Sequence, residues 1–159
     1  MKTPTEITKK AEGMFEKMES EDELLIAING ILKDVKSGKY SDEDEVVLSK
    51  VAYKLSVLMF GLGRYVARYT TLSNSAYIYR KFSYATEFKR LKQEGGRLAK
   101  EIESDSELSI VDKYENQIRA QYFADVMKTL YDECDRFVMV LLSRAKNVSR
   151  EKINSTLQT

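Results

Sequence analysis

Apolar residues recur three and four positions apart over most of the chain, and this spacing predicts helices. Residues 1–38 contain two short amphipathic patterns, one beginning near Pro4 and the other near Ser20. Residues 42–94 and 110–150 predict two long helices. In the first of these the alternation continues for more than four heptads, as in a coiled-coil seam, at Leu48, Val51, Leu55, Leu58, Leu62, Tyr65, Tyr69, Leu72, Ala76 and Tyr79.

This pattern predicts a single all-α domain in which the two long helices form a hairpin, with the short N-terminal helices packed on it or on a partner chain. Gly61 and Gly63 predict a kink or a close helix crossing in preference to a phosphate loop, because no strand precedes them. Gly95 and Gly96 end the central helix, and the polar segment "ESDSELS" after them predicts a loop or a new helix cap. A long hairpin leaves part of its seam uncovered, so we expect a homo-oligomer.

Composition excludes several kinds of chemistry. The chain has one cysteine and no histidine, which rules out an internal disulfide and the usual zinc ligand sets. Cys134 falls on the seam of the C-terminal helix, which favours a buried side chain over a reactive thiol. The acids lie in runs typical of helix starts, so we expect neither an enzyme nor a cofactor. The first residues lack the apolar core of a signal peptide and no segment approaches the roughly 20 apolar residues of a membrane span, so we expect a soluble, cytoplasmic protein without membrane contact.

Basic charge is concentrated in residues 61–100, which carry nine Lys or Arg and two acids. On a helix, Tyr77, Lys81, Tyr84 and Phe88 follow one another at spacings of four, three and four, so aromatic rings and cations share a face. Such a face suits single-stranded nucleic acid, DNA or RNA, because rings stack on unpaired bases while cations contact phosphates. The candidate nucleic-acid-binding residues are Tyr77, Arg80, Lys81, Tyr84, Phe88, Lys89, Arg90 and Lys92.

A packing interpretation stays open beside the binding one. These aromatics would then pack against the N-terminal helices, and their cations would pair with acids of residues 16–23 or 42–45. In that case we expect a helical protein-interaction module, such as a virion assembly component or an inhibitor of a host protein, that docks a partner through its acidic N-terminal half and its seam.

The layout of the chain resembles a known family. Short N-terminal helices, a central helix ending in a basic and aromatic stretch, a polar break and the segment "AQYFADVMKTLYDECDRFVMVLLSRAKNVSRE" are together similar to the UvsY-type recombination mediators of bacteriophages. The resemblance covers roughly residues 50–155. The acidic N-terminal region and the loop at residues 93–109, which is not especially basic, depart from the family pattern and put the oligomer geometry in doubt.

The resemblance implies a non-enzymatic protein that binds single-stranded DNA and helps to load a RecA-like recombinase onto strands covered by single-strand-binding protein. The positions that match the basic DNA-binding segment of the family are Arg80, Lys81, Lys89, Arg90 and Lys92. The family assembles into ring-like oligomers through its C-terminal helices. The corresponding assembly surface here would be Tyr131, Cys134, Val138, Leu141 and Leu142.

Overall fold

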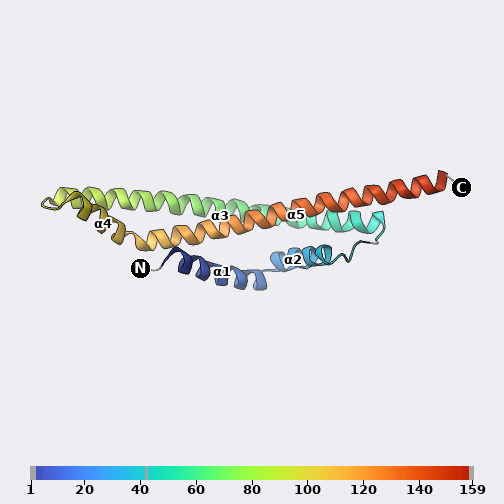
Figure 1. The fold of residues 1–159 in the computed structure, drawn as a ribbon, viewed down its shortest axis with the longest axis horizontal. Helices are drawn as coiled ribbons and strands as arrows, with labels where there is room; N and C mark the ends of the chain where they lie inside the picture. Colours follow the sequence, from blue (N-terminus) through green and yellow to red (C-terminus); the bar gives the residue numbers. More distant parts are fainter. Residues whose placement is uncertain (1–2, 42, 158–159) are drawn as a thin grey trace. The chain divides into compact units, whose positions relative to one another are not determined.

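The structure is a computed structural model that describes residues 3–41 and 43–157. It confirms the all-α fold, because the described residues form five helices: α1 (Pro4–Glu21), α2 (Glu23–Lys36), α3 (Glu45–Glu94), α4 (Ala99–Ser109) and α5 (Val111–Leu157). The long helices α3 and α5 pack against each other as a hairpin, as predicted, and the short helices α1 and α2 pack with them (Figure 1). Asp42, the first residue of the predicted central helix, lies outside the described residues.

Side-chain caps fix the starts of the first two helices. The Thr3 amide donates to Glu6 Oε2 at 2.7 Å and the Glu6 amide donates to Thr3 Oγ1 at 3.3 Å, so a capping box precedes Pro4, where a helix was expected. Ser20 does not cap α2, contrary to the prediction, because it lies in the last turn of α1. Asp22 takes that role, and its Oδ1 accepts from the amides two and three residues further on at 3.0 and 3.1 Å.

The polar segment after α3 differs from its prediction. Asp44 caps α3 in the same way as Asp22 caps α2. Gly95 and Gly96 adopt φ angles of 72° and 75°, which end the helix as expected. The sequence "ESDSELS" is helical, however, and belongs to α4. The polarity of α4 resembles that of a loop because only two of the eleven residues of this helix, Ile102 and Ser106, are buried.

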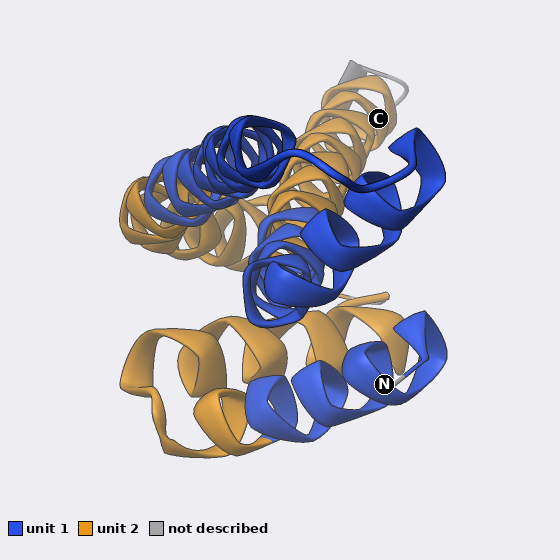
Figure 2. Ribbon diagram, turned by 90° about the vertical axis from the view of Figure 1, so that its left-hand side faces the viewer, with its two compact units in different colours: residues 1–16, 67–126 blue, residues 17–66, 127–159 orange. Residues whose placement is uncertain are grey.

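The chain forms two compact units (Figure 2). Unit 1 comprises residues 1–16 and 67–126, and unit 2 comprises residues 17–66 and 127–159. The helices α1, α3 and α5 each contribute to both units.

Unit 1 is held together by an aromatic cluster and by polar contacts between α3 and α5. The ring of Phe123 lies 5.8 Å from that of Phe15 in α1 and 5.3 Å from that of Tyr69 in α3. Ser73 Oγ donates to Gln121 Oε1 at 2.7 Å. Residues later in α3 therefore contact residues earlier in α5, as Tyr69 with Phe123 and Ser73 with Gln121, so the two helices run antiparallel as in a hairpin.

Unit 2 has an aliphatic core. Leu48 and Ala52 of α3 are buried against Leu141 and Ala145 of α5. Gly61 lies where α2 meets α3, because a methyl group on it would come within 2.9 Å of Leu24 Cδ2. The buried residues of α2 are Leu25, Ile28, Ile31 and Leu32. The close helix crossing expected near the glycines is therefore present at Gly61.

The buried stripe of α3 follows the predicted seam only in part. Leu48, Leu55 and Leu62 are buried as expected. Beyond them, Leu72 and Tyr79 are exposed, so the predicted seam is wrong at these two positions. The residues that α3 buries in addition to the predicted ones include Ala52, Met59, Ser73 and Leu91.

One helix of the described residues, α3, is long and apolar enough to cross a membrane, judged by length and composition alone. The buried core helix of a soluble protein meets the same criterion, and 28% of the apolar window of α3 is buried here. The expectation that no segment approaches such a composition fails for α3, which has no acid between Val46 and Thr86.

Candidate nucleic-acid interface

In unit 1, two pairs of neighbouring residues of α3 each consist of an exposed apolar residue and a more deeply buried polar one. Ser73 is buried and hydrogen-bonded to Gln121, whereas Leu72 is exposed. Arg80 is half-buried, whereas Tyr79 is 60% exposed. This inverts the usual preference for apolar residues in the interior. Large apolar side chains that a fold leaves outside in this way mark a surface that contacts something else.

Arg80 is the centre of a cluster of aromatic and basic residues. Its guanidinium carbon lies 5.9 Å from the ring centroid of Tyr77 and 5.6 Å from that of Tyr114 in α5, while Lys81 Nζ lies 4.7 Å from the Tyr77 ring. Within the described part of the chain, Arg80 Nε is buried without a hydrogen-bond partner. A groove of about 530 Å³ in this part of unit 1 is lined by Arg80, Lys81, Tyr84, Ala85, Glu107 and Ile110.

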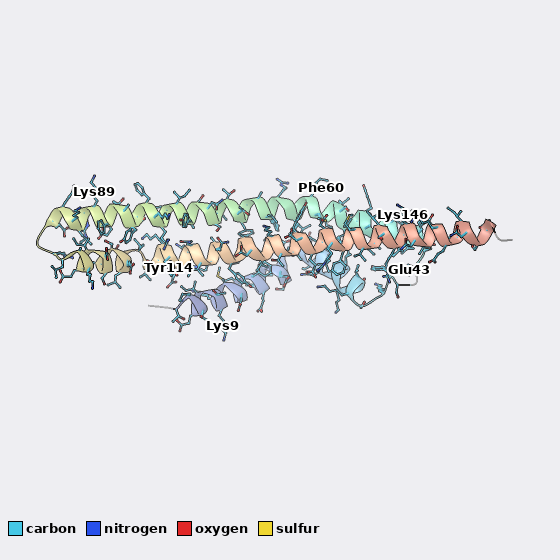
Figure 3. All side chains as sticks on the ribbon, turned by 45° about the horizontal axis from the view of Figure 1, so that its top comes forward. Lys9, Glu43, Phe60, Lys89, Tyr114 and Lys146 are labelled. Carbon is cyan, nitrogen blue, oxygen red and sulfur yellow. The ribbon has the colours of Figure 1, made fainter. Side chains whose placement is uncertain are left out.

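The predicted cations differ in whether a described acid forms an ion pair with them. Lys81, Lys89 and Lys92 are exposed, and none of them forms an ion pair with another described residue. Figure 3 shows Lys89 on the side of α3 that faces away from α4. Arg90, by contrast, pairs with Glu87 at 2.6 Å and with Glu94 one turn later. The hydrogen bond with Glu87 raises the pKa of Arg90 and lowers the pKa of Glu87.

The predicted stacking residues also divide into two groups. Tyr77 is exposed, but Tyr84 and Phe88 are half-buried and stack on each other, with ring centroids 6.0 Å apart. Tyr79 and Phe82, in the same part of α3, are exposed and were not among the predicted site residues. The sequence signal for Phe82 was that Tyr77, Phe82, Tyr84 and Phe88 cannot all lie on the seam.

The predicted subunit interface lies mostly inside the chain. Cys134, Val138 and Leu141 are buried within unit 2. Tyr131 is half-buried and Leu142 is 46% exposed. Burial raises the pKa of the Cys134 thiol to about 11, in agreement with its expected place in the core.

Known proteins give no further guide to the site. No family model matches the sequence, and no curated protein or solved structure matches it either. The resemblance to UvsY-type mediators therefore stays a prediction. Among the described residues no cluster of three or more His, Cys, Asp or Glu side chains is arranged to hold a metal ion.

Proposed function

We propose that this protein binds single-stranded nucleic acid, with single-stranded DNA as its ligand, along the part of α3 that belongs to unit 1. The observation that carries the proposal is the exposure of Tyr77, Tyr79 and Phe82 on the same segment of α3 as three exposed cations, Lys81, Lys89 and Lys92, that form no ion pair with a described acid. Aromatic faces and free cations are the two components of sequence-independent single-strand binding.

Each component has a defined role in this proposal. A base stacked on an exposed ring contributes about 1 to 3 kcal/mol, and every base has a face that can stack. The lysines contact phosphates and release condensed counterions, which makes the affinity depend on salt. Arg80, held between the rings of Tyr77 and Tyr114, lines the adjacent groove together with Lys81 and the acid Glu107, and the two cations would contact a phosphate that enters this groove.

The biological role that we propose rests on the sequence resemblance. A mediator of the UvsY type would hold single-stranded DNA as a homo-oligomer in the cytoplasm and help a RecA-like recombinase to displace single-strand-binding protein. No catalytic residue, metal or cofactor enters this role.

The alternative function, a protein-interaction module, predicts a different arrangement of the same cations. It requires the basic face to close a contact within the chain or between subunits. Arg90 does contact acids of its own helix, but Lys81, Lys89 and Lys92 form no ion pair with a described acid. The free lysines therefore favour the nucleic-acid proposal.

Fluorescence anisotropy with a labelled single-stranded oligonucleotide tests the proposal. We expect the single strand to bind more tightly than a duplex of the same sequence. With three free lysines on phosphates, log affinity should fall with log salt concentration at a slope of about −2, since each contact on a single strand contributes about −0.7. An affinity that stays flat over a several-fold rise in salt would contradict the mechanism.

Variants separate the stacking contribution from folding. Replacing Tyr79 and Phe82 by Ser should weaken binding about tenfold or more, because two stacking contacts are lost. Leu108→Ser is the matched control, because Leu108 is an equally exposed apolar residue of unit 1 on α4. If Leu108→Ser weakens binding as much as the α3 variant does, the proposed face is not the binding site.

A further inference from the structure

A second exposed apolar surface lies on α3, in unit 2. Val46, Tyr53, Val57 and Phe60 follow one another at spacings of seven, four and three, which places them on one stripe of the helix. Tyr53 is 73% exposed and Phe60 is 81% exposed, and both valines are exposed as well. Figure 3 shows Phe60 on the side of α3 that faces away from α5. The proposed nucleic-acid face lies on other residues, in unit 1.

Basic residues flank most of this stripe, and the acids nearest to it in the sequence lie at its N-terminal end, at Glu43, Asp44 and Glu45, where Asp44 interacts electrostatically with Lys50. Lys50, Lys54 and Arg64 are exposed beside it, and none of them forms an ion pair with another described residue. No acid occurs in α3 between Val46 and Thr86. An occupant that covers the stripe must therefore accept apolar side chains and carry negative charge.

From this combination we infer that the stripe of Val46, Tyr53, Val57 and Phe60 docks on an anionic lipid surface. Two aromatic and two aliphatic side chains present apolar area on the order of 400 Å², which is the size of a functional patch rather than of scattered exposed residues. Aromatic residues on one face with lysine and arginine beside them are typical of helices that lie in the interface of an anionic bilayer.

The shape of the stripe favours a membrane surface over a groove in a protein. Side chains as exposed as Tyr53 and Phe60 protrude from the helix, so they can enter the headgroup region to a depth of about 5 to 10 Å. The helix lies on the bilayer and does not span it, because the opposite side of the same segment, at Leu48, Leu55 and Leu62, is buried in the core of unit 2.

A second copy of the chain fits the same stripe less well. Two copies that met face to face through it would bring Lys50, Lys54 and Arg64 of each chain close to those of the other. Like charges across an interface oppose association. Anionic headgroups remove this repulsion.

Co-sedimentation with lipid vesicles tests the inference on the full chain. We expect binding to vesicles of phosphatidylglycerol and phosphatidylcholine, and little binding to vesicles of phosphatidylcholine alone. The double variant Tyr53→Ser, Phe60→Ser should partition into the anionic vesicles at least about tenfold more weakly than the unchanged protein, because it lacks the aromatic side chains that insert. Met139→Ser, at an exposed apolar position of α5 in unit 2, is the matched control and should bind as the unchanged protein does.

Three results would overturn the inference: no binding to the anionic vesicles, equal loss in the control variant, or a dimer in solution that Tyr53→Ser, Phe60→Ser dissociates. The last result would assign the stripe to a second copy. Lys50→Gln with Lys54→Gln checks the electrostatic part without touching an apolar residue, and it should weaken binding to the anionic vesicles. Oligonucleotide binding measured on the same variants keeps this result distinct from the nucleic-acid proposal, because it depends on unit 1.

Discussion

Tyr65 Oη donates a hydrogen bond of 2.7 Å to Asp22 Oδ2. The other oxygen of the same carboxylate caps α2, where it accepts from the amides of Leu24 and Leu25. One side chain thus fixes the start of α2 and ties it to α3, at a place where sequence patterns alone predicted only that the N-terminal helices pack on the hairpin.

The two residues of this contact should differ in their effect on stability. Tyr65→Phe removes one hydrogen bond and should lower the free energy of unfolding by about 1 kcal/mol. Asp22→Ala removes the same bond together with the cap and should cost about 2 kcal/mol. Urea unfolding followed by circular dichroism measures both. Equal costs for the two variants would show that the cap contributes nothing.

Glycines in helix interiors should respond to alanine according to the space around them. Nothing lies within 4 Å of a methyl group placed on Gly30, so Gly30→Ala should raise the free energy of unfolding by about 1 kcal/mol. At Gly61 the same methyl group would meet Leu24 at 2.9 Å, and the gain should be smaller or reversed. Melting temperatures of the two variants compare them directly, and a larger gain at Gly61 would mean that the close crossing is absent.

The thiol of Cys134 should be unreactive until the protein unfolds. A pKa of about 11 in place of 9.0 lowers the thiolate fraction at neutral pH about 100-fold, and burial blocks access as well. Reaction with a chromogenic disulfide reagent should therefore be slow in buffer and fast in denaturant. Fast reaction in buffer would place Cys134 outside the core.

Acid should weaken unit 2 through two carboxylates. A hydrogen bond from Lys39 lowers the pKa of Asp34, and backbone hydrogen bonds from Val47 and Val46 lower the pKa of Asp44. Because these pKa values are below the ordinary 3.8, the contribution is complete above that pH and is lost as pH falls through the lower folded values. Asp34→Asn and Asp44→Asn should therefore destabilise at pH 6, and their effect on stability should shrink as the pH falls below 3.8. An effect that does not shrink with falling pH would contradict this assignment.

The apolar pattern was enough to predict α1, α2, α3 and α5, but it predicted neither α4 nor which side of α3 faces α5. At Leu72 and Ser73, and again at Tyr79 and Arg80, hydrophobicity assigned the first residue of each pair to the seam. In the structure Ser73 is buried because Gln121 satisfies its hydroxyl, and Arg80 is half-buried between two rings. A pattern of apolar positions cannot detect partners of this kind.

Pairing within the helix also decided which predicted cations are free. Lys89 and Arg90 are neighbours and looked equivalent in the sequence. The acids that neutralise Arg90 lie three residues before it and four after it, spacings that a helix brings together. The signal was therefore present in the sequence, at Glu87 and Glu94, but it depended on helix geometry that charge counting ignores.

The affinity of two single variants for a single-stranded oligonucleotide, over a salt series, tests the central claim most directly. Lys89→Gln removes a free cation and should weaken binding and reduce the salt slope by about 0.7. Arg90→Gln removes a cation that acids already neutralise, so its affinity and salt slope should change far less. Equal effects of the two variants, or no binding by the unchanged protein at low salt, would contradict the proposal that this face of α3 holds nucleic acid.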